Sequence, residues 1–174
     1  TSVSAGAGGS SSVAVGWATE NVAGNVTQTN QVDLAALSGK VGGSITLDRS
    51  DNSYNSVTNL TAGSAISLRT DSSLTISGAL TSTTGAATIM SNSTQTVSST
   101  GSVNAASSIA MTSTQNAISI AGAVSSSAGS ITLQTNNSSG TIGVTSTGSV
   151  TTLGTAQSLT INGYRAITIA GAIS

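Results

Sequence analysis

The sequence of 174 residues contains no histidine, no cysteine, no proline and no phenylalanine. Without His and Cys the chain lacks the side chains of most nucleophilic, proton-shuttling and transition-metal chemistry, and a Ser-His-Asp triad cannot form. The absence of cysteine also excludes a fold held together by disulfides. We therefore expect no catalytic residues, no cofactor and no metal ligands, and we do not expect an enzyme.

Charged residues are also scarce, at 5% of the chain, with four basic and five acidic side chains. Four basic residues do not supply the positive surface that nucleic acids require, so nucleic acid is excluded as a partner. No apolar run reaches the length of about 18 residues that a membrane span requires. The chain begins at Thr1 without the basic and apolar segments of a signal peptide. We expect that such a signal was removed or that the sequence is a piece of a longer chain.

Hydroxyl residues are the most abundant class in the sequence. The 35 serines and 28 threonines make up more than a third of the chain. Disordered chains combine low hydrophobicity with high net charge. Here the net charge is −1 and the mean hydropathy is +0.23. Val, Ile and Thr favour strands, and hydroxyl side chains compete with the helical backbone. The composition therefore predicts β-structure with an almost uncharged surface.

A repeat organises the chain from about residue 43 onward. Three similar heptapeptides begin at Leu74, Ile118 and Ile167, each with Gly-Ala at its fifth and sixth positions. Three columns of apolar residues recur with a common period of about 22 residues. The columns are Ile45, Ile66, Ala87, Ile109 and Ile131; Ile76, Val97, Ile120, Val144 and Ile169; and Leu80, Val103, Val124, Val150 and Ile173.

This period predicts an all-β fold, a single-stranded parallel β-helix (β-solenoid) with about 22 residues and three strands per turn. Side chains alternate between the two sides of a strand, so Ile45 and Leu47 are predicted to point inward and Thr46 outward. Parallel connections are generally right-handed, and we expect the same of this coil. Bends between strands are expected at the glycines of the heptapeptide, Gly78, Gly122 and Gly171.

The period divides the chain into two parts. Residues 43–174 are predicted to form about six turns, with a longer loop near residues 151–155. Residues 1–42 keep the period poorly and are expected to form an irregular N-terminal lead-in or cap, with one or two extra strands. We expect the only tryptophan, Trp17, either to be buried at that end of the core, which we favour, or to anchor an interface.

The last apolar strand, residues 167–173, reaches the C-terminus without a polar cap after it. The terminal turns of solenoids are normally covered by atypical, polar segments. Ile167, Ile169 and Ile173 are therefore a candidate assembly interface. Its expected partner is a flanking solenoid turn or another copy of the same chain.

Several of these units resemble the repeats of filamentous-haemagglutinin-type exoproteins and of β-helical autotransporter passengers. They are Gly-Ser-Ile-Thr-Leu at 43–47 and 129–133 and the heptapeptides at 74–80 and 167–173. The resemblance covers about residues 43–174 and implies a large surface adhesin outside a Gram-negative cell, used for adhesion, biofilm cohesion or toxin delivery. It involves core and corner positions only, so no functional residue of the family carries over.

One weak charged cluster interrupts the repeat, and it consists of Asp48, Asp51, Arg69 and Asp71. A step of 21 residues places Asp48 beside Arg69 and Asp51 near Asp71. One interpretation is a carboxylate pair of the kind that polysaccharide-cleaving enzymes use, or a calcium site built from oxygen ligands. The other, which we favour, is a set of surface ion pairs worth about 0–1 kcal/mol.

Tyr164 and Arg165 are predicted to lie in an exposed turn.

The sequence thus predicts a non-catalytic, extracellular structural or adhesive rod segment of a secreted or cell-surface bacterial fibre or adhesin. Its expected partners are copies of itself or flanking solenoid turns, and glycans or proteins of a host or neighbouring cell. The alternative is a filament protomer that stacks head to tail through uncapped turns. An ice-binding solenoid, suggested by the outward Thr and Ser residues, and a polysaccharide-active solenoid are less expected.

Overall fold

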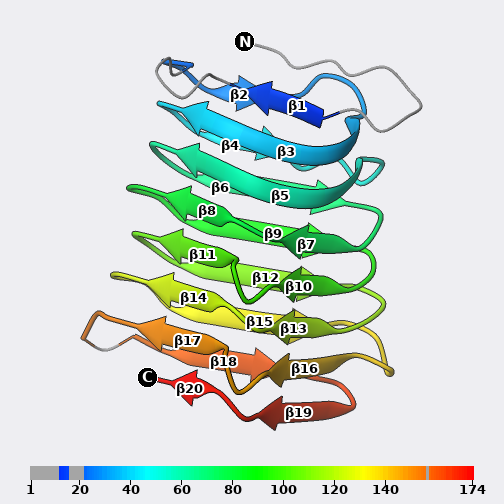
Figure 1. Ribbon diagram of the computed structural model, residues 1–174, viewed down its shortest axis with the longest axis vertical. Helices are drawn as coiled ribbons and strands as arrows, with labels where there is room; N and C mark the ends of the chain where they lie inside the picture. Colours follow the sequence, from blue (N-terminus) through cyan, green and yellow to red (C-terminus); the bar gives the residue numbers. More distant parts are fainter. Residues whose placement is uncertain (1–11, 16–21, 156) are drawn as a thin grey trace.

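In the computed structural model the chain winds into a β-solenoid whose turns stack along one axis (Figure 1). The structure describes residues 12–15, 22–155 and 157–174. Two parallel sheets run the length of this part of the chain, and no helix occurs in it. The predicted all-β solenoid fold is therefore confirmed. Trp17 and part of the predicted lead-in, residues 1–11 and 16–21, lie outside the described residues.

Sheet A contains one strand from each turn, and its seven strands show that the described chain makes seven turns. Each strand pairs in parallel with its counterparts in the adjacent turns. The strands are β2 (Val26–Thr27), β4 (Ile45–Leu47), β6 (Ile66–Thr70), β9 (Ala87–Ser91), β12 (Ile109–Ser113), β15 (Ile131–Thr135) and β18 (Leu159–Asn162).

Sheet B contains the remaining thirteen strands and closes the other sides of the coil. Its first strands are β1 (Ser12–Val15), β3 (Asp33–Val41) and β5 (Ser53–Ala62). From the third turn onward each turn contributes two short strands in place of one long strand. These are β7 (Leu74–Ile76), β8 (Ala79–Ser82), β10 (Gln95–Val97), β11 (Ser102–Ala105), β13 (Ile118–Ile120), β14 (Ala123–Ser126), β16 (Thr141–Val144), β17 (Ser149–Thr152), β19 (Ala166–Ile169) and β20 (Ala172–Ile173).

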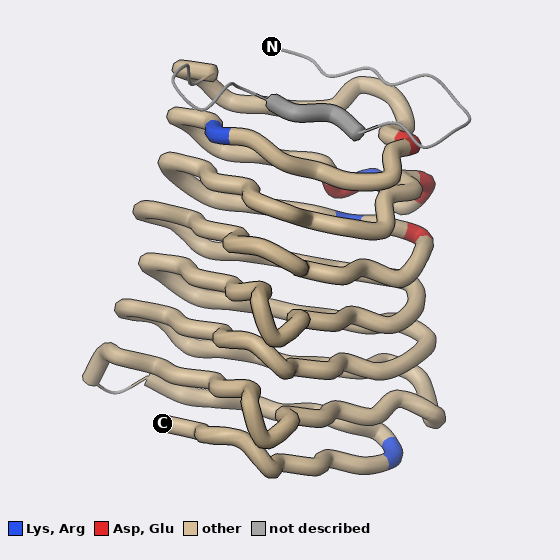
Figure 2. The backbone as a smooth tube through the Cα atoms, in the orientation of Figure 1, with Lys and Arg blue, Asp and Glu red and all other residues tan. Residues whose placement is uncertain are grey.

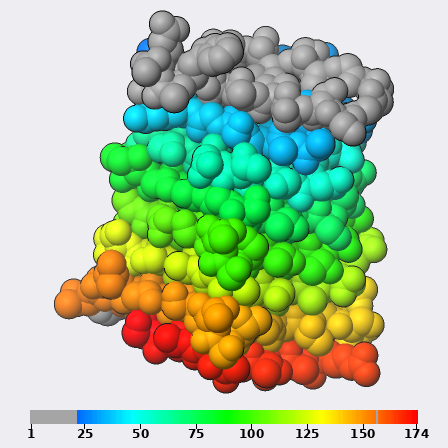
Figure 3. Space-filling model, viewed as in Figure 1, coloured from blue at the N-terminus to red at the C-terminus, as the bar shows by residue number. Residues whose placement is uncertain are grey.

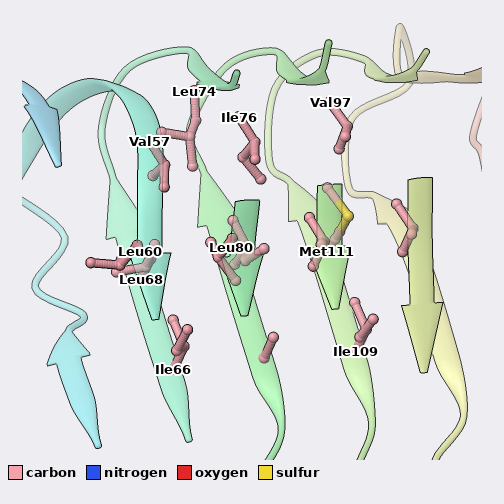
Figure 4. Close-up of a cluster of buried hydrophobic side chains, with 14 of the residues drawn as sticks. Val57, Leu60, Ile66, Leu68, Leu74, Ile76, Leu80, Val97, Ile109 and Met111 are labelled. Carbon is pink, nitrogen blue, oxygen red and sulfur yellow. The ribbon is translucent and has the colours of Figure 1, made fainter. Parts of the chain in front are cut away.

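Each apolar column that the sequence predicts is a column of residues in register. Ile45, Ile66 and Ala87 are paired in successive strands of sheet A, and the same register continues to Ile131. The columns beginning at Ile76 and Leu80 follow sheet B in the same way. Figure 4 shows these side chains meeting between the sheets. The three columns form one continuous apolar core, in which most side chains are fully buried.

Glycine residues divide the long sheet B strand into two short strands in the later turns. Gly78, Gly122 and Gly171 each separate the two sheet B strands of their turn, as the heptapeptide predicts. The backbone of one turn passes close to that of the next at these bends. A Cβ on Gly122 would meet the carbonyl oxygens of Gly101 and Ser98. The long strands β3 and β5 are instead continuous, with a register shift between Leu37 and Ser38.

The longest connection in the last three turns lies between β17 and β18 (residues 153–158), where the sequence predicts a loop. Figure 3 shows this part of the chain protruding from an otherwise even side of the molecule. The extra residues stay outside the coil, because Ile131 and Leu159 are still paired in sheet A. The core register is therefore unaffected by the difference in turn length.

Buried hydroxyl groups fill the corner at the end of the sheet A strands. Thr70, Ser91, Ser113 and Thr135 occupy one inward column and are almost fully buried. The Ser91 and Ser113 hydroxyls both donate to the carbonyl oxygen of Ser93, at 2.7 and 2.6 Å. Buried polar groups are tolerated when they are hydrogen-bonded. Serine and threonine can therefore replace apolar residues where the chain turns and leaves carbonyl groups free.

We predict that Gly122→Ala destabilises the protein by about 2 kcal/mol or more, because the new methyl group overlaps two backbone carbonyls of the preceding turn. Gly143→Ala is the matched control, since no atom lies within 4 Å of a Cβ built there. An alanine in the middle of a strand should be neutral or slightly stabilising. Thermal unfolding followed by far-UV circular dichroism measures both variants. Equal midpoints for the two variants would contradict the tight bend.

Candidate functional site

The charged cluster lies on the outside of the second and third turns. Asp48 and Asp51 follow β4, Arg69 lies in β6, and Asp71 follows β6; all four side chains are exposed. Leu47 and Leu68 are paired, which places Asp48 and Arg69 in adjacent turns as the spacing predicts. The structure does not join them in an ion pair. Among the described residues the salt bridge is instead between Arg49 and Asp51.

Arg49 binds Asp51 through two parallel hydrogen bonds. Arg49 Nε donates to Asp51 Oδ1 at 3.0 Å, and Nη2 donates to Oδ2 at 2.8 Å. These hydrogen bonds lower the pKa of Asp51 and raise the pKa of Arg49. Both side chains are about half exposed, at 47% and 46%, so solvent screens the attraction between them. The pair links two residues of the turn after β4, and both Asp51 carboxylate oxygens accept a hydrogen bond from Arg49.

An amide pair formed by buried Asn52 and partly exposed Gln28 joins three turns beside the cluster, and no pattern in the sequence predicts it. Asn52 is fully buried, and its side chain exchanges two hydrogen bonds of 2.8 Å with the Gln28 amide. Asn52 Oδ1 also accepts from Val32 N, and Nδ2 donates to the carbonyl of Arg69. Every hydrogen-bonding group of the Asn52 amide is therefore in use. Its role is to hold the turns together, and it has no group left for a ligand.

Tyr54 lies directly inside this region and is fully buried. Its hydroxyl donates to the carbonyl of Leu47 at 3.2 Å. Removal from water raises the pKa of the Tyr54 phenol well above its usual range. The ring fills the core under the charged cluster, so the cluster is built on a rigid base.

The chemistry that these groups can perform is narrow. Within residues 22–155 and 157–174, no three acidic, histidine or cysteine side chains gather closely enough to hold a metal ion. The described chain also contains no helix long and apolar enough to cross a membrane. The arrangement of Asp48, Asp51, Arg69 and Asp71 is that of exposed surface charges around one ion pair.

The candidate assembly interface forms the last turn. Both sheets end there, with β18 at the end of sheet A and β19 and β20 at the two ends of sheet B. Ile167, Ile169 and Ile173 are exposed at 45%, 48% and 39%, although their counterparts in the preceding turn are fully buried. The apolar columns of the core therefore extend into the last turn, where their final residues are partly exposed to solvent.

Two separate hollows that no motif in the sequence predicts lie along the corner where the sheet A strands end, and this corner is at the right of Figure 1. We call this corner, with its two hollows, the corner groove. The hollows have volumes of about 220 and 450 Å³. The first is lined by Ser50, Arg69, Thr70, Met90, Asn92 and Thr114, and the second by Gln134, Thr135, Asn162, Gly163 and Tyr164. Tyr164, which the sequence places in an exposed turn, is 70% exposed at the lower end of this groove.

Comparisons with models of protein families, with characterised proteins and with solved structures found no match. The resemblance to haemagglutinin-type exoproteins and autotransporter passengers is therefore not supported by these comparisons and stays a prediction drawn from the repeat units.

We predict that stability falls at alkaline pH because of Tyr54. The pKa of this phenol is raised in the folded protein, so only the unfolded chain loses its proton just above pH 10. The stabilisation is complete below about pH 10 and falls by about 1.4 kcal/mol per pH unit above it. Urea unfolding between neutral pH and pH 11 measures this slope.

Tyr54→Phe should remove that part of the slope, at the cost of one hydrogen bond to Leu47. Tyr164→Phe is the matched control, because that ring is exposed. An unchanged slope in Tyr54→Phe would show that the phenol is not the group responsible.

Proposed function

We propose that the chain is a non-catalytic structural segment of an extracellular rod, part of a secreted or cell-surface bacterial fibre or adhesin. The observation that carries this proposal is the uninterrupted parallel ladder of seven turns around one apolar core. Each turn is hydrogen-bonded to the turns beside it, so bending or opening the rod requires many bonds to break together. The mechanism is mechanical: the segment provides length and stiffness.

The distribution of charge supports a place outside the cell. Residues 72–164 contain no charged side chain. Figure 2 shows the charged residues in the first turns and at the last one, with none in the turns between. Stability that rests on apolar burial and backbone hydrogen bonds changes little with salt, or with pH below about 10. Such a segment suits surroundings whose composition the cell does not control.

The scarcity of cleavage sites for trypsin-like proteases supports the same proposal. The sequence has only four Lys or Arg residues at which a trypsin-like protease can cut. Arg69 lies within β6, where the backbone is paired with β4 and β9. Proteolysis needs an extended, accessible backbone, which a paired strand does not offer. Arg49 and Arg165 lie in exposed turns, so we expect trypsin-like cleavage to be confined mainly to those two turns, with the paired strands left intact.

The location is tested by labelling intact cells of the producing organism with an antibody raised against this chain. We expect labelling of intact cells or of fibres shed from them, at the level seen after permeabilisation. An antibody against a cytoplasmic protein is the control for cell integrity. Labelling that requires permeabilisation would contradict the extracellular proposal.

A second function, a filament protomer that stacks head to tail, is favoured by the exposed last turn. A parallel strand added to β19 or β20 would continue the hydrogen-bonded ladder, and its apolar residues would cover Ile167, Ile169 and Ile173. A stacked subunit would meet little charge repulsion, because Arg165 is the only charged residue after Asp71. In both proposals the hydrogen-bonded ladder of parallel strands continues beyond the last turn of this segment.

We predict concentration-dependent association in sedimentation velocity and fibres in negative-stain electron microscopy. Ile169→Lys should weaken the association, because it places a charge on the core side of β19. Thr168→Lys is the matched control, since Thr168 precedes Ile169 in the same strand and faces away from the core. A chain that stays monomeric at every concentration, or equal effects of both variants, would exclude stacking through this face.

A further inference from the structure

We propose that the corner groove binds a linear, uncharged oligosaccharide that lies parallel to the axis of the rod. This inference rests on the proposed function, since glycans are the ligands that an adhesive rod meets outside a cell. It adds a site and a ligand class to that proposal. The position of the groove, the groups that line it and the distribution of charge along it all favour such a ligand.

The two hollows belong to one continuous edge. Arg69 is paired with Met90, Met90 with Thr112, Thr112 with Gln134, and Gln134 with Asn162. These outward residues form a column that passes from the first hollow to the second. Four steps between adjacent strands cover about 19 Å. A ligand in the groove would therefore be extended along the rod and would contact several turns.

The lining combines amide and hydroxyl groups with two large side chains. In the first hollow Thr114 Oγ1 donates to Asn92 Oδ1 at 2.6 Å, which fixes the amide and leaves its Nδ2 as a donor. In the second hollow the Asn162 amide makes no side-chain hydrogen bond to another described residue. Met90 and Tyr164 supply the apolar surface, one in each hollow. Donors, acceptors and an exposed ring are the groups that bind a ligand with polar edges and apolar faces, as sugar rings have.

Charge favours an uncharged ligand over an ionic one. Arg69 is the one charged residue that lines the first hollow, and Asp48 and Asp71 lie beside it in the chain or in the adjacent turn. From residue 72 to Tyr164 the edge carries no charge at all. An anionic chain would gain from Arg69 but would meet these two carboxylates and then no further cation. A chain of neutral sugars needs no such partner.

The groove also favours a ligand that is bound by side chains rather than by backbone. The strands of sheet A along it, from β4 to β15, are each paired on both sides. Among the described strands that line the groove, only β18 at its lower end has an unpaired edge, so a peptide has no strand to which it could add along the first hollow. A hydroxyl-rich ligand needs only the side chains that the groove presents.

The test is an NMR titration of the isotope-labelled protein with neutral hexasaccharides of glucose, mannose, galactose and N-acetylglucosamine. We expect at least one of them to bind with a dissociation constant of about 1 mM or tighter. Tyr164→Ala and Asn92→Ala should each weaken that binding by about tenfold. Far-UV circular dichroism confirms that each variant is folded, and Tyr164 is exposed enough to be removed without loss of core packing.

Two matched variants on other faces serve as controls. Thr132→Ala changes the flat outer face of sheet A, and Asn104→Ala changes a hollow on the sheet B side of the rod. Both should bind the hexasaccharide as the unchanged chain does. If no hexasaccharide binds at millimolar concentration, or if all four variants bind equally, the groove is not a glycan site. The rod proposal would survive either result, because cell labelling tests it separately from binding by the purified chain.

Discussion

Register between adjacent turns is the constraint on which the rest of this structure depends. The side chains of a strand alternate between the core and the outside, so a slip of one residue would exchange the two sets. Ile45, Ile66 and Ile131 are buried because the register holds over the whole of sheet A. Differences in turn length are therefore confined to loops such as residues 153–158, where the chain leaves the coil.

Register also determines where glycine and the hydroxyl residues occur. Adjacent backbones come closest at the bends of sheet B, and Gly101, Gly122 and Gly148 follow one another there in successive turns. At the opposite corner the chain leaves carbonyl groups unpaired, and serine or threonine side chains donate to them. One composition therefore serves two purposes: β-branched residues build the strands, and small or hydroxyl residues make the corners. A surface built in this way needs almost no charge.

The sequence was sufficient to predict the fold because the repeat is strongest in the core. The columns beginning at Ile76 and Leu80 recur in every later turn, and apolar residues at a constant period of this length are typical of stacked turns. Gln95 stands in a column between Leu74 and Ile118 and weakens the signal there without moving the strand. Its Nε2 donates to the carbonyls of Ile89 and Thr112, whereas its Oε1 is buried without a hydrogen-bond partner among the described residues.

The first turns and the outer surface could not be predicted in the same way, because they lack the repeat. Strand β3 has no bend glycine of the heptapeptide kind, and Gly39, with a φ of 139°, follows its register shift. The amide pair of Gln28 and Asn52 lies outside the repeat, so no period reveals it. The corner groove gives no sequence signal for a related reason, because the outward residues along it share a column but not a residue type; they are Arg69, Met90, Thr112, Gln134 and Asn162.

That difference between columns bears on function. The outward column of Thr46, Ser67 and Thr88 is small and nearly uniform, so a ligand sliding along it by one turn would meet the same groups again. The neighbouring outward column changes from Arg69 to Met90 and ends at Asn162, and therefore differs at each turn. A rod of identical turns provides reach but cannot fix the position of a ligand along its axis. A column of unlike residues makes each position along the axis different. Of these two outer surfaces, the corner groove is therefore better suited to specific binding than the flat face of sheet A.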